Sequence, residues 1–251
     1  ILVHADAPIP KSASITFILV GTSLITLRYV EPRPISTYAT RLLRQQEICS
    51  TGEEVLAGLI EAFVDRIADV LEKVALDLDH VSQSIFDKPT AGPGSGTTST
   101  DLQSVLNSLG RNNDLVSTVR ESLLSLTRLI RFYLPTLAAG DKTPTEVRNR
   151  LNSARGDISS LNEHASFESQ KINFLLDATL GMINVEQNGI IKIFSVVAAV
   201  FLPPTLIASI YGMNFQFMPE LSWLSGYPMS IGLMIVSAVR PVIYFRRKGW
   251  L

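Results

Sequence analysis

One uninterrupted apolar segment constrains this sequence more than any other feature. It runs from Ile193 to Asn214, reads IFSVVAAVFLPPTLIASIYGMN, and has the phenol of Tyr211 as its only ionisable side chain. A run of about 20 uncharged, mostly apolar residues is long enough to cross a bilayer as a helix. The segment therefore predicts a first membrane span, residues 193–214.

A second apolar run, residues 227–245, follows a short connection, residues 215–226, whose only charge is Glu220. Basic residues flank the two runs on their other sides: Lys171, Lys192, Arg246, Arg247 and Lys248. Lys and Arg mark the cytoplasmic ends of membrane spans. We therefore expect two transmembrane helices, an external loop over 215–226, and a basic cytoplasmic tail over 246–251. Both termini are expected in the cytoplasm, and two such runs disfavour the alternative of a large soluble helical protein.

Composition narrows the chemistry of the chain. Hydrophobic residues make up 46% and charged residues 18%, and most of the charge lies before residue 193. The net charge of −1 gives no indication of a nucleic-acid partner, and none is expected. Cys49 is the single cysteine, so no intrachain disulfide can form. His4, His80 and His164 have no metal-ligand spacing, and no phosphate loop or nucleophile motif predicts an enzyme.

The N-terminal part predicts a β-hairpin followed by helices. Residues 14–20 and 24–30 are rich in Ile, Leu, Val, Thr and Phe, and residues 21–23 supply a glycine-containing turn. Because the chain starts at Ile1 without a methionine, we expect a fragment whose remaining strands lie upstream. Helix is expected from about Ser36, and residues 1–140 are interpreted as a cytoplasmic α/β domain with an incomplete N-terminus.

Three long helices are expected after the hairpin. Apolar residues recur every three or four positions over 53–86, and a second amphipathic helix covers 101–138. The breaker-rich loop 89–98 between them predicts an antiparallel pair. Residues 143–146 read Thr-Pro-Thr-Glu, a helix start with an N-cap, a proline in the first turn and a capping box. No proline follows until Pro203, so a stalk helix, residues 143–192, is expected to continue into the first span.

At Tyr211-Gly212-Met213-Asn214, continued as Phe215 to Leu221 in the pattern YGMNFxxMPEL, the chain resembles the CorA family of divalent-cation transport proteins. The family signature is Gly-Met-Asn at the outer end of the first membrane helix. The resemblance implies a mainly α membrane protein that assembles as a homopentamer in a bacterial or archaeal inner membrane. It also implies transport of Mg²⁺, with Co²⁺ or Ni²⁺ as alternative cargo, and regulation by cytoplasmic Mg²⁺.

The first span carries the residues expected to line a pore. Two membrane helices per chain cannot enclose a polar path, so transport requires an oligomer. Heptad spacing places small or polar residues, with Leu202 as the bulky exception inside the span, on one stripe: Asn188, Ile191, Ser195, Ala198, Leu202, Thr205 and Ser209. Close helix packing through small residues is the alternative. The resemblance implies pore positions at Asn188, Phe194, Leu202 and Thr205 and an acidic ring at Asp177. Phe194 and Ser195 are neighbours, so the stripe from heptad spacing and the pore positions implied by the resemblance differ by one residue.

Asn214 has the chemistry of a pore entrance. Mg²⁺ keeps an octahedral water shell, and a neutral ring of amide oxygens can hold the hydrated ion without retaining it. Gly212 permits a backbone approach that a side chain would obstruct, and Met213 is expected to pack against the loop. Gly212, Met213 and Asn214 are therefore the expected selectivity filter.

Regulation and two further features stay open at the level of sequence. Family members are thought to close when Mg²⁺ binds carboxylates between subunits. The candidates are Asp65, Asp69, Asp77 and Asp79 on one side and Asp157 or Glu163 on the other, with Ser153 where a stalk carboxylate would be expected.

Pro203-Pro204 predicts a bend in the first span. Arg240 lies inside the second span and either snorkels to the cytoplasmic end or pairs with an unidentified group.

Two alternatives to a magnesium channel remain. A zinc transporter of the same superfamily is one, although such relatives carry isoleucine where this chain has Met213. The other is a membrane-anchored helical scaffold that conducts no ion. Such a scaffold would give Asn214 and the polar stripe no function.

Overall fold

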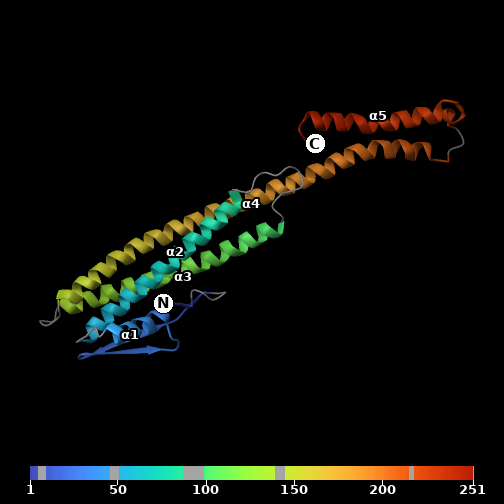
Figure 1. Cartoon of the computed structure of the whole chain (residues 1–251). Helices are drawn as coiled ribbons and strands as arrows, with labels where there is room; N and C mark the ends of the chain where they lie inside the picture. Colours follow the sequence, from blue (N-terminus) through green and yellow to red (C-terminus); the bar gives the residue numbers. More distant parts are fainter. Residues whose placement is uncertain (5–9, 46–50, 87–98, 139–144, 215–217, 251) are drawn as a thin grey trace. The chain divides into compact units, whose positions relative to one another are not determined.

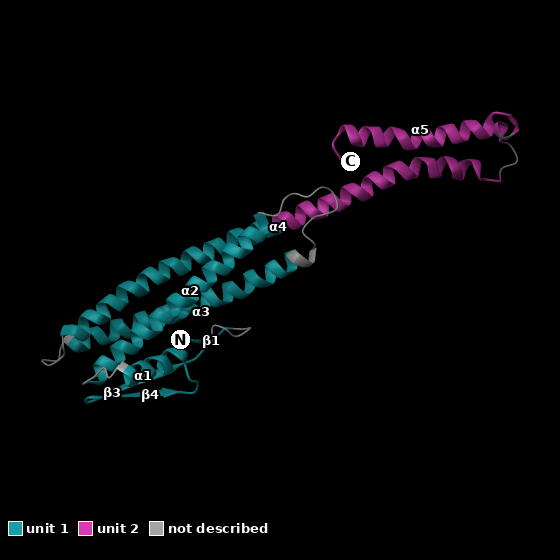
Figure 2. Cartoon of the chain, viewed as in Figure 1, with its two compact units in different colours: residues 1–180 teal, residues 181–251 magenta. Residues whose placement is uncertain are grey.

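The computed structural model describes residues 1–4, 10–45, 51–86, 99–138, 145–214 and 218–250 (Figure 1). The chain divides into two compact units, residues 1–180 and residues 181–251 (Figure 2). Unit 1 contains the strands, three helices and the first part of a fourth helix. Unit 2 contains the rest of that helix and the C-terminal helix.

Two small antiparallel sheets open unit 1. β1 (Leu2–His4) pairs with β2 (Lys11–Ser12), and β3 (Ile15–Val20) pairs with β4 (Ser23–Arg28) in register from Ile15 opposite Arg28 to Val20 opposite Ser23. The predicted hairpin is confirmed, but its turn has two residues rather than three. Gly21 adopts a φ of 56°, the left-handed region that glycine enters without a steric penalty. The β1–β2 pair was not predicted, because β2 has only two residues.

The first two helices of unit 1 pack beside the hairpin. α1 (Arg33–Gln45) begins three residues earlier than expected, because a proline in the first helical turn loses no internal hydrogen bond. α2 (Gly52–Phe86) starts against the hairpin turn, where the Gly52 N–H donates to the Thr22 carbonyl at 2.7 Å. A Cβ on Gly52 would lie 2.8 Å from the Leu24 nitrogen. Glycine at this position therefore lets the helix approach the strand.

α2, α3 (Ser99–Ala138) and the first part of α4 (Thr145–Tyr211) form the core of unit 1. Arg150 of α4 binds Glu61 of α2 at 2.9 Å, and Lys171 binds Asp79 at 2.6 Å, so α2 and α4 run parallel. α3 runs antiparallel to α2, as the sequence predicts. Almost fully buried side chains from all three helices fill the space between them: Ile60, Phe63, Ile67, Leu71, Leu78, Leu109, Leu123, Leu126, Ile130, Leu151 and Leu175.

α4 is one 67-residue helix, which confirms that stalk and first span are continuous. It passes through Pro203 and Pro204 and ends at Tyr211. The predicted N-cap Thr143 and Pro144 lie outside the described residues. α5 (Gly226–Arg247) follows η1 (Pro219–Ser222), a short 3₁₀ helix within the expected loop.

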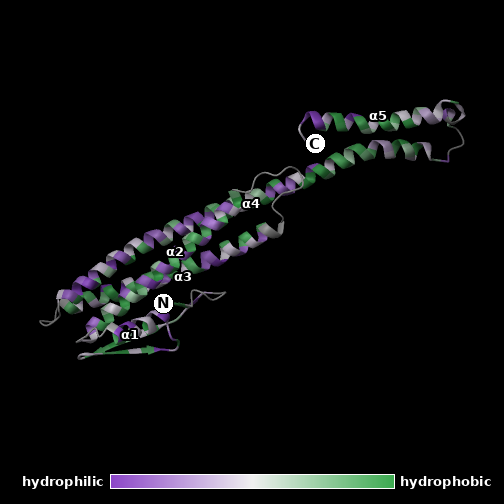
Figure 3. Cartoon of the chain, in the orientation of Figure 1, coloured by the Kyte–Doolittle hydropathy of each residue, from purple (hydrophilic) through white to green (hydrophobic). Residues whose placement is uncertain are grey.

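Two helices in the described part of the chain are long and apolar enough to cross a membrane, α4 and α5. Figure 3 shows the difference along the chain: apolar and polar residues alternate in unit 1, whereas the second half of α4 and most of α5 are apolar. Only 6% of each apolar window is buried, so neither is the core helix of a soluble domain.

The C-terminal end of α5 contacts the start of the first span. Gly249 has a φ of 69°, which turns the chain back after the helix. Trp250 then stacks on Phe245 with ring centroids 5.3 Å apart, and the Lys192 Nζ lies 5.7 Å from the Trp250 ring centroid. Lys192 and Trp250 thus lie together at one end of the two spans, while Tyr211 and Gly226 bound the connection between them. The two spans form a helical hairpin.

Candidate functional site

The predicted filter residues follow directly after α4. The Gly212 N–H donates to the Ala208 carbonyl at 2.9 Å and the Met213 N–H to the Ile210 carbonyl at 3.2 Å, so the backbone tightens as the helix ends. A Cβ on Gly212 would lie 3.1 Å from the Ala208 oxygen, which explains glycine here without any unusual φ. Met213 is half exposed and Asn214 is exposed. The amide of Asn214 is therefore accessible at the end of the first span.

From Val196 onward, the buried and partly buried residues of α4 lie on one side of the helix. Their spacing of three or four residues defines a single face, which we call the packing face: Val196, Ala199, Val200, Pro203, Pro204, Ile207 and Tyr211. α5 carries a matching set of less exposed residues: Ser230, Met234, Ser237, Ala238, Pro241 and Phe245. The two sets are the mutual contact surfaces of the helical hairpin, because α5 and η1 are the other described elements of unit 2.

The predicted pore residues lie on the opposite side of α4. At about 100° per residue, the mean direction of the predicted set is about 180° from that of the packing face. All of its members are exposed: Asn188, Ile191, Phe194, Ala198, Leu202, Thr205 and Ser209. Phe194 and Ser195 are both exposed and lie at similar angles on either side of the centre of this face, so the single chain does not choose between them. We call this side of α4 the free face.

Two hydroxyl groups of the first span donate their protons to their own helix. Ser195 Oγ donates to the Ile191 carbonyl at 2.7 Å, and Thr205 Oγ1 donates to the Phe201 carbonyl at 2.6 Å. Each oxygen keeps its lone pairs as acceptors. The waters around a cation point their hydrogens outward, so hydroxyl and amide oxygens are the groups that a hydrated cation can bind. Thr205 in α4 and Asn214 just after its end therefore both offer oxygen acceptors to a hydrated cation.

The carboxylates predicted to sense Mg²⁺ have different environments in unit 1. All six are exposed, and Asp79 is already paired with Lys171. Asp65 differs from the other five carboxylates because its surroundings shift its pKa. Its pKa is raised, first by burial, then by the Glu61 carboxylate and further by Asp69 and Asp157, while Arg41 acts in the opposite direction. The fold therefore brings Asp65, Asp69 and Asp157 into electrostatic contact. Among the described residues, no three Asp, Glu, His or Cys side chains form a metal-binding group.

Asp65→Asn should raise the thermal unfolding midpoint at pH 7. A raised folded-state pKa gives stability that is present below the unfolded value of 3.8 and is lost as pH rises through the folded value. The ionised carboxylate therefore costs stability at pH 7, and the amide removes that cost. Thermal melting of the full chain in detergent with EDTA, at pH 7 and near pH 4, measures the effect.

The gain should be largest at pH 7 and should shrink as the pH approaches 4. Asp114→Asn, which changes an exposed carboxylate of α3, is the matched control and should leave the midpoint unchanged. A midpoint that falls in Asp65→Asn at pH 7 would show that the carboxylate is stabilised rather than repelled.

One functional-site candidate was missed by the sequence reasoning. Glu168 is 2% exposed, its Oε1 lies 3.2 Å from His164 Nε2, and its Oε2 has no hydrogen-bond partner among the described residues. The position of Glu168 in the helical repeat could have predicted its burial. Glu168 falls between the buried Ala165 and Ile172 at spacings of three and four, so it belongs to the apolar face of α4.

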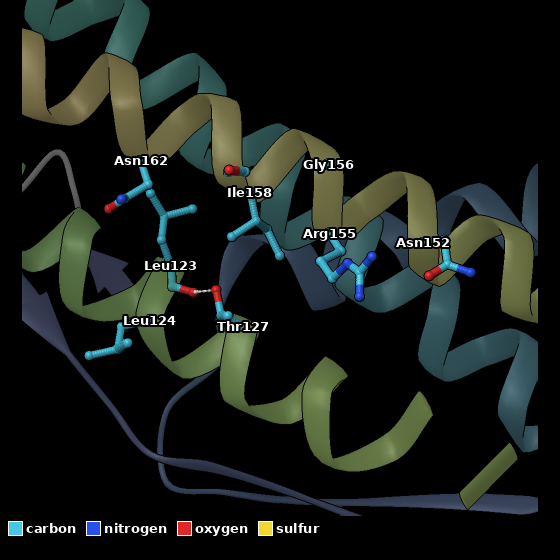
Figure 4. Close-up of a pocket in the computed structure, with 9 residues that line it drawn as sticks. Leu123, Leu124, Thr127, Asn152, Arg155, Gly156, Ile158 and Asn162 are labelled. Carbon is cyan, nitrogen blue, oxygen red and sulfur yellow. Dashed lines mark hydrogen bonds between the residues drawn. The ribbon is translucent and has the colours of Figure 1, made fainter. Parts of the chain in front are cut away.

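A cleft between α3 and α4 in unit 1 contains none of the predicted site residues (Figure 4). α4 supplies Asn152, Arg155 and Asn162, and α3 supplies Leu124 and Thr127. No carboxylate is among the residues that line it, so its chemistry does not favour a cation.

The fold and the surface define a class of protein: a membrane protein with a long stalk helix that continues into a helical hairpin, whose exposed face carries the hydroxyl groups of Thr205 and Ser209. Comparison with known proteins identifies the family. The family model described as CorA-like Mg2+ transporter protein matches residues 3–247, and the chain belongs to this family. The magnesium transport protein CorA of Haemophilus influenzae is 41% identical over 239 residues, covering 95% of this chain and 72% of that protein.

Other relatives agree with this assignment. The magnesium transport protein CorA of Yersinia pseudotuberculosis is 38% identical over 240 residues, covering 96% of this chain and 72% of the relative. The solved structure of the complete CorA magnesium transporter from Methanocaldococcus jannaschii superposes with a TM-score of 0.71 at 17% identity, over 95% of this chain and 80% of that one. The structural likeness confirms the fold: a mainly helical membrane protein with a long stalk helix and a small N-terminal strand region.

Proposed function

We propose that the chain is the subunit of a homopentameric channel in the inner membrane that conducts hydrated Mg²⁺, with Co²⁺ or Ni²⁺ as alternative cargo. The single observation that carries the proposal is the free face of α4. It holds the acceptors Thr205 and Ser209, and it lies opposite the packing face that α5 covers. A polar face in a membrane span needs shielding from lipid, and copies of the same face around an axis supply that shielding.

In this channel, α4 lines the path and α5 lies outside it. The Asn214 amides form the entrance ring, and Gly212 and Met213 hold its backbone. Asp177 is exposed in the part of α4 that precedes the first span. A ring of carboxylates there would attract cations at the cytoplasmic mouth. Positive charge at Lys192 and in the tail supports a cytoplasmic location for both termini.

Gating by internal Mg²⁺ is the second part of the proposal. The Asp69 and Asp157 carboxylates each raise the pKa of Asp65, in addition to the larger effects of burial and the Glu61 carboxylate. A divalent cation that binds between neighbouring subunits at these carboxylates would remove the repulsion and favour the closed packing. Asp77 and Glu163 remain alternative ligands on the same surfaces.

Magnesium influx into liposomes that contain the full chain tests the function. Influx should follow the electrochemical gradient, need no proton gradient, and fall as the internal Mg²⁺ concentration rises. If no Mg²⁺ influx is measured at any internal Mg²⁺ concentration, and a proton gradient drives Zn²⁺ flux, the zinc-transporter alternative is supported. No flux of any divalent ion would favour a non-conducting scaffold.

A further inference from the structure

Arg240 is a charged residue inside an apolar helix. It is exposed, and the structure gives its guanidinium no hydrogen-bond or ion-pair partner among the described residues. It lies seven residues before Arg247, the last residue of α5, which is about 10 Å along the helix axis. An arginine at this depth is costly in hydrocarbon unless an anion or water meets it. The position of Arg240 therefore calls for a counter-ion.

Arg240 belongs to a stripe to the side of the surface of α5 that faces α4. Arg240, Tyr244 and Arg247 are spaced by four and three residues and share one side of α5. This side lies about 100° from the less exposed residues of α5. Lys248 adds a further cation, because its Nζ lies 5.4 Å from the Tyr244 ring centroid. Three cationic groups thus gather around one exposed tyrosine.

The same stripe is apolar where it continues toward the start of α5. Leu233 and Val236 are 46% and 59% exposed, and both lie within about 40° of Arg240 around the helix. The surface therefore has a cationic end beside the C-terminus of α5 and an apolar stretch deeper in the span. This polarity matches one lipid molecule, with a charged headgroup above its acyl chains.

Protein carboxylates do not provide the counter-ion at this depth. The sequence from residue 181 onward contains two acidic residues, Glu186 and Glu220. Glu220 lies in η1, next to the other end of α5, and Glu186 precedes Lys192 by six residues and so lies beyond the span. A second copy of the chain brings the same two residues at the same depths. An anion that pairs with Arg240 at this depth therefore comes from a lipid headgroup rather than from a protein carboxylate.

We propose that Arg240, Arg247 and Lys248 form a binding site for one anionic phospholipid in the leaflet at the C-terminal end of α5. Guanidinium groups bind phosphate oxygens in pairs, and Arg240 can reach the phosphate by extending toward the end of the helix. The acyl chains lie along Leu233 and Val236. The inference requires α5 to span a bilayer and does not depend on what the protein transports.

Electron paramagnetic resonance of spin-labelled lipids tests the site. The full chain is reconstituted in phosphatidylcholine vesicles, and the motionally restricted fraction is measured for spin-labelled phosphatidylglycerol and for spin-labelled phosphatidylcholine. The chain should select phosphatidylglycerol, and Arg240→Leu should reduce that selectivity about fivefold. Arg240→Lys keeps the charge and should retain most of it.

Arg246→Leu is the matched control. It removes the same charge near the same end of α5, but Arg246 lies about 120° from Arg240 around the helix. Selectivity close to that of the parent in this control supports a localised site. Equal losses in Arg246→Leu and Arg240→Leu, or no loss in Arg240→Leu, would overturn it. If Arg240→Leu fails to insert, Arg247→Leu decides in the same way, because Arg247 belongs to the stripe but ends the helix.

Discussion

Asn214→Ala should abolish magnesium influx while leaving the folded oligomer intact. Asn214 is exposed immediately after α4, so its truncation should not disturb the packing of the described residues. Each hydrogen bond between an amide oxygen and a water of the hydrated ion is worth about 0.5–1.5 kcal/mol. In the proposed pentamer five subunits lose it together, so entry of the ion should slow by about fiftyfold or more. Dye-reported influx into liposomes measures the change.

Two substitutions at the filter separate chemistry from structure. Asn214→Asp replaces the amide by a carboxylate, which should bind Mg²⁺ more tightly and release it more slowly, so influx should saturate at lower external Mg²⁺. Met213→Leu conserves volume and apolar character and should retain influx. Parent-like influx in Asn214→Ala would remove Asn214 from the filter. Loss of influx in Met213→Leu as well would point to a damaged loop rather than a lost ligand.

The sequence predicts most of the fold because its signals are local. The hairpin follows from two segments rich in Ile, Leu, Val, Thr and Phe on either side of a turn with Gly21, and α2 and α3 follow from apolar spacing. The continuous α4 follows from the lack of proline between residues 145 and 202. α1 starts at Arg33 rather than at the predicted Ser36, because the proline at position 34 is favourable in a first helical turn. β1 and β2 depend on a non-local pairing that local patterns do not encode.

The candidate site was less predictable because it depends on orientation and neighbours. Helical spacing places Ala198, Leu202 and Thr205 on one stripe, but it cannot decide whether α5 covers that stripe. The structure leaves it exposed and covers the opposite side. The environment of Asp65 also needed the fold, since Asp157 is far away in sequence and belongs to another helix. Helix rotation in the assembly, which selects Phe194 or Ser195, involves several subunits and stays a prediction.

A pair of adjacent alanines offers the sharpest test of the free face. Ala198 lies at its centre, and Ala199 lies on the packing face that α5 partly buries. The two residues have the same size and nearly the same depth in the membrane, and they differ by about 100° around α4. Each is replaced by cysteine in a chain whose native Cys49 is serine, and a positively charged thiol reagent is added during influx measurements.

Modification of Ala198→Cys should reduce magnesium influx at least about tenfold, whereas Ala199→Cys should be unaffected. A thiol reacts as the thiolate, which forms in contact with water, so the reaction itself reports a wet surface. In the proposed pentamer, five cations fixed around a narrow path then repel a divalent ion in a medium of low dielectric constant. A block at Ala199→Cys without one at Ala198→Cys would mean that the face toward α5 conducts and that the exposed stripe packs against neighbours. The same comparison at Phe194→Cys and Ser195→Cys would determine which residue faces the axis.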